Sequence, residues 1–142
     1  MAEIFNPDGD QHWGVFVPMK CAGTCTRGYA VAMDVSGDIT NAATATLHAV
    51  CGVAYKSGVA GETILVQVLG YCDYVVTDGD AAAADMVLAA VDGGTTVGMT
   101  EAELAADITL GFNVIGRNLG DDSSTAGRCL LCPTPVLGGH DT

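Results

Sequence analysis

Basic residues are scarce in this chain of 142 residues, which has 5 Lys and Arg against 17 Asp and Glu. The formal net charge is therefore −12, and the isoelectric point is near 4.1. Proteins bind nucleic acids and anionic membranes largely through clusters of basic side chains. Five cations cannot line such a surface, so we expect neither a nucleic acid nor a membrane as a partner.

Long apolar runs and aromatic residues are also rare. No segment approaches the roughly 18 apolar residues that a membrane-spanning helix needs, and aromatic residues make up only 6% of the chain. The first residues, MAEIFNPDGDQHWG, carry acids where a signal peptide has a basic end and an apolar stretch. We therefore expect synthesis in a cytoplasm.

Small apolar residues are abundant instead. Hydrophobic residues account for 49% of the chain, the mean hydropathy is +0.37, and there are 19 glycines. This composition, dominated by Ala, Val and Leu, is typical of short packed strands joined by tight turns. The length suits one domain with one core. We therefore predict a mainly β fold, a compact β-barrel or β-sandwich-like domain with one short helix.

Residues 1–19 differ from the rest because they concentrate aromatic and apolar side chains without a sustained period. We predict an extended N-terminal arm over 1–19, a β-rich domain over 20–136 and a flexible C-terminal tail over 137–142. The arm would place anchors on a partner surface: Ile4, Phe5, Trp13 and Phe16. The alternative is that Trp13 and Phe16 pack onto their own domain.

An internal pseudo-repeat begins near residue 27. Each half has an apolar strand ending in a Gly turn, a variable link, a strand that begins with Gly, an Ala-Gly turn and a closing apolar strand. Gly52 corresponds to Gly116, and AGETILV (60–66) aligns with AGRCLLC (126–132). This alignment places Cys129 at the position of Thr63.

Alternation and capping signals predict the individual elements. In TILVQVLG the residues Ile64, Val66 and Val68 share one face, and both faces are mostly apolar, which indicates a strand buried on both sides. By propensity GDAAAADMVLAAVDGG reads as an Ala-rich helix. We expect instead a turn at Gly79-Asp80 and a second strand at Met86–Val91, because the paired segment in the first half of the repeat is a strand. The one helix signal is TEAELAAD, where Thr100 and Glu103 form a capping box.

Six cysteines raise the question of a metal site. CAGTC (Cys21, Cys25) and CLLC (Cys129, Cys132) could supply four thiolates to a zinc ion. The two pairs are far apart in sequence, however, and cysteine is often buried as a small apolar residue. We expect packing or disulfide formation, with no metal and no cofactor. Fifteen pairings are possible for six cysteines, so sequence does not name a bond.

No catalytic constellation stands out. The three histidines have unrelated contexts, and GDDSST (120–125) lacks the ligand periodicity of a calcium loop. No nucleophile elbow, phosphate-binding loop or nucleotide-binding glycine motif occurs. We do not expect an enzyme.

The segment AGETILVQVLGYCDYVVTDGDAAAADMVLAAVDGG, followed by VIGRNLGDDSSTAGRCLL, resembles the small capsid decoration (cement) proteins of tailed phages. The matching elements are Gly61-Glu62, Val66 to Gly70, Asp85 to Leu88, Asp92-Gly93 and Gly116 to Leu119. The resemblance covers about residues 27–132.

The resemblance implies a β-barrel-like domain, often trimeric, on the exterior of an icosahedral capsid, where it bridges copies of the major capsid protein. The expected location is the virion surface, after synthesis in the host cytoplasm. Two alternatives are kept. One is a phage-borne adhesion module that recognises host glycans through aromatic side chains such as Tyr71 and Tyr74. The other is a small zinc-stabilised domain.

Overall fold

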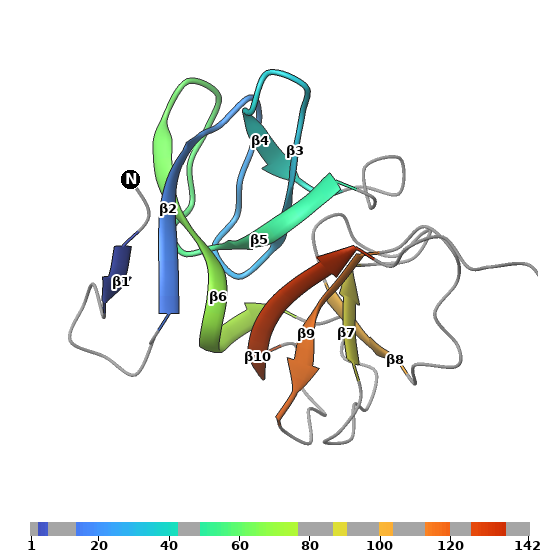
Figure 1. Cartoon of the computed structure of the whole chain (residues 1–142). Coiled ribbons are helices and arrows are strands. Elements are labelled where there is room, and N and C mark those ends of the chain that lie inside the picture. The colour runs from blue at the N-terminus through green and yellow to red at the C-terminus, as the bar shows by residue number, and fades with distance from the viewer. Residues whose placement is uncertain are drawn as a thin grey trace, which may run out of the picture.

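A computed structural model of the chain describes residues 3–5, 14–42, 49–76, 87–90, 100–103, 113–119 and 126–135. These residues form a mainly β structure in which every strand pairing is antiparallel (Figure 1). The predicted fold class is confirmed. No helix in this part of the chain is long and apolar enough to cross a bilayer. The strands are β1 (Glu3–Phe5), β2 (Gly14–Lys20), β3 (Ala30–Met33), β4 (Ile39–Asn41), β5 (Val50–Ala54), β6 (Thr63–Val76), β7 (Val87–Ala90), β8 (Thr100–Glu103), β9 (Asn113–Asn118) and β10 (Ala126–Pro135).

The first half of the chain closes into a small barrel. Strand β6 pairs with β2 and β5, β5 pairs with β3, and β3 pairs with β4. Cys21, the residue after β2, forms a bridge with Ile39 of β4, and the Ala22 N–H donates to the Ile39 carbonyl at 2.8 Å. This last contact joins the two ends of the five-stranded sheet.

The barrel interior holds one of two buried clusters. The interior cluster consists of Cys21, Cys25, Val31, Ile39, Ala54, Ile64 and Val66, with Met19, Cys51 and Val68 packed against it. The face of β6 predicted from alternation, Ile64, Val66 and Val68, therefore lines this interior. Burial on the other face of β6 is confirmed at Gln67, which is 0% exposed, while Thr63 is exposed.

A second cluster lies on the outer side of β3 and β5. It brings together Ala42, which follows β4, with residues of β3, β5, β6 and β10: Ala30, Ala32, Val50, Val53, Cys72, Val75, Cys129 and Leu131. Strands β3 and β5 are therefore buried on both faces. Small side chains such as Ala30 and Ala32 allow the layer formed by β6 and β10 to pack closely against them.

The two halves of the sheet have the same pairing scheme. The strand order is β4-β3-β5-β6-β10-β9-β7-β8, so β5 and β9 hold equivalent places beside β6 and β10. The β3–β5 ladder is irregular just after the pair Val31 and Gly52, and the β7–β9 ladder is irregular just after Leu88 and Gly116. At both glycines an added Cβ would collide with a carbonyl of the next strand. Gly52 and Gly116 thus occupy the same position, where two backbones approach too closely for a side chain.

The register of the closing strands differs from the sequence alignment by three residues. Ala54 pairs with Val66, and its equivalent Asn118 pairs with Cys129. Cys129 therefore stands at the position of Val66 rather than Thr63. Val66 and Cys129 are both fully buried, whereas Thr63 is exposed. The register of these closing strands follows from which face of each strand is buried. The Ala-Gly dipeptide that the two halves share does not determine it.

Strand β6 bends between its two halves. Gly70 has φ of +105°, a conformation that favours glycine, and it is the last β6 residue paired with β2 and the first paired with β10. Figure 1 shows the resulting sharp turn in the ribbon of β6. The first half of β6 thus closes the barrel, and the second half begins the β10 side of the sheet.

The predicted helix start is wrong. Thr100–Glu103 forms β8, which pairs with β7 from Ala90 opposite Thr100 to Val87 opposite Glu103. A capping interaction is worth only about 1 kcal/mol, and pairing along a neighbouring strand satisfies the same backbone groups. The strand expected at Met86–Val91 is present as β7. The rest of the TEAELAAD segment, the turn at Gly79-Asp80 and the tail at 137–142 lie outside the described residues.

The proposed boundary at residue 19 falls inside a strand of the domain. Gly14–Lys20 is β2, and its residues pair with β6 from Gly70 to Thr63. The arm prediction is therefore wrong for residues 14–19, because this segment completes the barrel. Upstream of it, β1 pairs with β2 through Ile4 opposite Val15 and Phe5 opposite Gly14.

Candidate functional site

The four candidate anchors have different positions. Phe16 is 0% exposed, and its ring meets Tyr55 edge to face with centroids 5.1 Å apart. Phe16 therefore belongs to the core and is removed from the candidate contacts. Ile4 and Phe5 lie in β1, at the margin of the sheet. Trp13 lies outside the described residues.

A polar network sits at the bend of β6, among apolar neighbours. The Gln67 side chain is fully buried, and its Nε2 donates to the Tyr71 carbonyl at 2.8 Å and to the Leu69 carbonyl at 3.4 Å. The Tyr74 hydroxyl donates to Gln67 Oε1 at 2.6 Å. Burial raises the pKa of Tyr74 above its usual range. A neutral Tyr74 and the Gln67 amide thus hold the two halves of β6 in the bent arrangement.

Arg27 lies over this network, although it is an exposed residue. Its guanidinium carbon is 4.7 Å from the centroid of the Tyr74 ring and 5.1 Å from that of Tyr55. Its Nη1 donates to the Tyr55 carbonyl at 2.6 Å, and its backbone N–H donates to Ser57 Oγ at 2.9 Å. The Arg27 contacts tie the loop after β2 to the segment after β5. The arrangement stabilises the fold and supplies no nucleophile.

Sequence reasoning missed this network. One signal was present, because Gln67 is a polar residue inside the apolar strand TILVQVLG. A buried amide requires hydrogen-bond partners, so such a residue indicates a bend or a crossing of the chain close by. The partners themselves, Tyr74 and Arg27, could not be named without the fold.

The cysteines divide between the two clusters. Cys21, Cys25 and Cys51 lie in or against the barrel interior, while Cys72 and Cys129 lie in the outer cluster. The pairs Cys21/Cys25 and Cys129/Cys132 therefore do not come together as one set of four zinc ligands. Among the residues that the structure describes, no three His, Cys, Asp or Glu side chains are placed to hold a metal ion.

The barrel thiols are shielded from water. Burial, with a further contribution from the hydrogen-bonded Cys21 thiol, raises the pKa of Cys25 to about 12. Burial likewise raises the pKa of Cys51 to about 11. Cys51 Sγ is 4.0 Å from Met19 Sδ and 3.6 Å from the Val31 carbonyl. Thiols held neutral in this way are poor nucleophiles.

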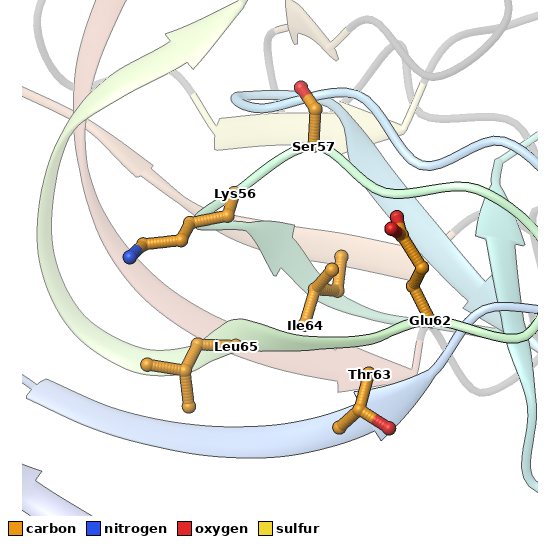
Figure 2. A pocket seen from close by; sticks show the side chains of 6 residues that line it. All are labelled: Lys56, Ser57, Glu62, Thr63, Ile64 and Leu65. Atoms are coloured by element: carbon orange, nitrogen blue, oxygen red, sulfur yellow. The ribbon is translucent and has the colours of Figure 1, made fainter.

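An open pocket of about 510 Å³ lies between the turn after β5 and the start of β6 (Figure 2). Two of its polar groups already accept hydrogen bonds from backbone N–H groups of the protein. Glu62 Oε2 accepts from the Val59 N–H at 2.9 Å, and Ser57 Oγ accepts from the Arg27 N–H. Figure 2 shows Lys56 and Glu62 at opposite ends of the pocket. The lining residues are Lys56, Ser57, Glu62, Thr63, Ile64 and Leu65. Their arrangement presents no convergent set of polar groups.

Two large apolar side chains are exposed where the halves of the sheet meet. Leu69 of β6 is 46% exposed and Leu130 of β10 is 48% exposed. Leu130 lies opposite the partly buried Tyr71, two residues along β6 from Leu69. Leu69 itself pairs with Val15 of β2, so the two leucines flank the bend at Gly70. We call Leu69, Tyr71 and Leu130 the central apolar strip.

The candidate histidines and acidic residues, His12, His48, His140 and Asp121 to Ser124, lie outside the described residues. A scan against models of known protein families and a search of curated proteins find no match to this chain.

Proposed function

We propose that this protein is a structural virion protein that binds the exterior of an icosahedral phage capsid and bridges neighbouring major capsid proteins. The proposal starts from the resemblance of residues 27–132 to tailed-phage decoration proteins. The structural observation that supports the proposal is the central apolar strip. Two leucines, each nearly half exposed, lie on the two sides of the Gly70 bend, Leu69 in the β2–β6 ladder and Leu130 in the β6–β10 ladder, and their exposure favours burial against another protein.

Charge supports the same proposal. A net charge of −12 keeps the isolated chain soluble despite its high mean hydropathy. It also favours a partner surface that is neutral or basic. The partner we propose is thus a capsid face with apolar contacts for Leu69 and Leu130, within a surface that carries few acidic groups.

We also propose a homotrimer. Three chains around one capsid axis would bury further apolar surface of each copy. Light scattering of the purified protein should give three times the chain mass of 14.4 kDa. A monomer at micromolar concentration would show that any trimer requires the capsid.

Cosedimentation with undecorated capsids, assembled from the major capsid protein of the same phage, tests the function. Leu69→Glu and Leu130→Glu should each weaken binding at least tenfold, because each places a charge in the contact and loses about 1 kcal/mol of apolar burial. Val35→Glu is the matched control, because Val35 is fully exposed in the turn between β3 and β4.

The assay distinguishes an error in the proposed function from an error in the proposed contact surface. If wild-type protein does not cosediment with these capsids, the proposed function is wrong. If it does, and all three glutamate variants bind equally well, the contact lies elsewhere than the central apolar strip. Circular dichroism of each variant should match the wild-type spectrum before binding is compared.

A further inference from the structure

Cysteines stand directly opposite one another at the seam between the two halves of the sheet. Cys129 of β10 is the ladder partner of Cys72 of β6. Both residues are 0% exposed, and both belong to the outer cluster. Directly opposed residues of antiparallel strands have Cα atoms about 4.5–5.5 Å apart. That separation lies within the range of about 4.4–6.8 Å found across disulfides.

The internal repeat shows which pair of residues in the first half corresponds to Cys72 and Cys129. Val66 is the equivalent of Cys129, because each pairs with the residue two positions after the equivalent glycine. Val66 pairs on its other side with Val17 of β2, as Cys129 pairs with Cys72. An ordinary apolar pair in the first half is thus matched by two thiols in the second. Packing alone would be satisfied by valine at both positions.

The other cysteines are less suited to a bond that joins the two halves. Cys21, Cys25 and Cys51 belong to the barrel interior, on the far side of β3 and β5 from Cys129. Cys132 is exposed and lies beyond the last β6–β10 pair. No disulfide joins any of the six cysteines in the structure.

We propose that Cys72 and Cys129 are a disulfide site that closes when the folding or transiently opened protein meets a small-molecule disulfide such as oxidised glutathione. One cysteine thiolate attacks the glutathione disulfide, forms a mixed disulfide and releases one glutathione thiolate. The second cysteine thiolate attacks the protein sulfur of that mixed disulfide and releases the second glutathione. Two protein thiols are oxidised, one glutathione disulfide is reduced, and both thiol protons end on glutathione.

The bond would join the halves of the sheet covalently. Cys72 and Cys129 enclose a long stretch of chain that includes β7, β8 and β9. Closing a loop of this length restricts the unfolded chain strongly, and the melting temperature should rise by about 10 °C on oxidation. Chain synthesis in a reducing cytoplasm followed by release into an oxidising medium would provide both redox states. This inference does not depend on the proposed capsid function.

Peptide mapping tests the site directly. The protein is refolded in a reduced and oxidised glutathione mixture, alkylated and digested with trypsin without reduction. Cleavage after Lys56, Arg117 and Arg128 leaves Cys72 on peptide 57–117, and Cys129 with Cys132 on 129–142. We expect these two peptides to be linked, and the link to disappear on reduction.

Two variants test whether the bond joins Cys72 and Cys129 and no other cysteine of the two peptides. Cys132→Ser should keep the link, because Cys129 is the proposed partner. The double variant Cys72→Val, Cys129→Val copies the Val17 and Val66 pair and should melt within a few degrees of the reduced wild-type protein. It should also lose the rise in melting temperature on oxidation.

Three outcomes would overturn the proposal. They are full alkylation of all six cysteines after oxidative refolding, loss of the link in Cys132→Ser, or linkage of peptide 57–117 to 21–27 or 28–56 instead.

Discussion

Replacing Phe16 by alanine tests whether β2 is part of the domain. The Phe16 ring is fully buried, contacts Tyr55 edge to face, and lies on a strand paired along seven residues with β6. Truncating such a ring costs about 3–5 kcal/mol of unfolding free energy, through lost burial and the cavity left behind. For a chain of this size the melting temperature should fall by about 10 °C. Urea unfolding followed by circular dichroism measures the unfolding free energy, and a thermal scan of the same signal measures the melting temperature.

Val35→Ala is the matched control for Phe16→Ala. Val35 is a fully exposed apolar residue, so its truncation should change the unfolding free energy by less than about 0.5 kcal/mol. Phe16→Leu keeps most of the volume and should fall between the two. A loss below 1 kcal/mol for Phe16→Ala would refute the packing of β2 and return Phe16 to the candidate capsid contacts.

Three further predictions concern the buried polar groups and a close backbone approach. Gln67→Leu should lower the unfolding free energy by about 1–3 kcal/mol because it removes the acceptor of the Tyr74 hydroxyl, and adding Tyr74→Phe should recover part of the loss in urea titrations. Folded Cys25 and Cys51 keep their protons to about pH 12 and pH 11, whereas the unfolded chain releases them from pH 9.0. Unfolding free energy should therefore fall as the pH rises from 9 to 11, by at most about 1.4 kcal/mol per pH unit for each thiol; Cys51→Ala should make this slope shallower, and an equal slope would contradict the assignment. Gly52→Ala should cost about 1–3 kcal/mol in the same urea assay, since its Cβ would collide with the Gln67 carbonyl; an unchanged midpoint would contradict the close approach.

Several parts of the fold could be predicted because local patterns report them directly. Alternation identified the face of β6 that carries Ile64, Val66 and Val68, since successive side chains of a strand point to opposite sides. The equivalence of Gly52 and Gly116 could be read from spacing, because only glycine fits where two backbones meet closely. The strand at 87–90 followed from the repeat, because the corresponding segment of the first half is a strand.

Other parts failed because pairing between distant strands overrides local signals. The capping pattern at Thr100 and Glu103 is real, but that segment is paired with β7. The shared Ala-Gly dipeptide suggested an alignment three residues away from the register that buries Cys129. Phe16 looked like part of an arm because its strand is separated in sequence from β6, the strand that it pairs with.

Sequence alone determined the class of this protein: an acidic, glycine-rich, mainly β chain with a repeat. These properties depend on composition and on spacing between near neighbours. Only the tertiary structure decided which residues meet, because a strand's partner is chosen by burial over the whole sheet. The fold set Gln67 beside Tyr74 across the bend at Gly70. It also placed Cys72 opposite Cys129, a contact between distant strands that the spacing of the cysteines does not reveal.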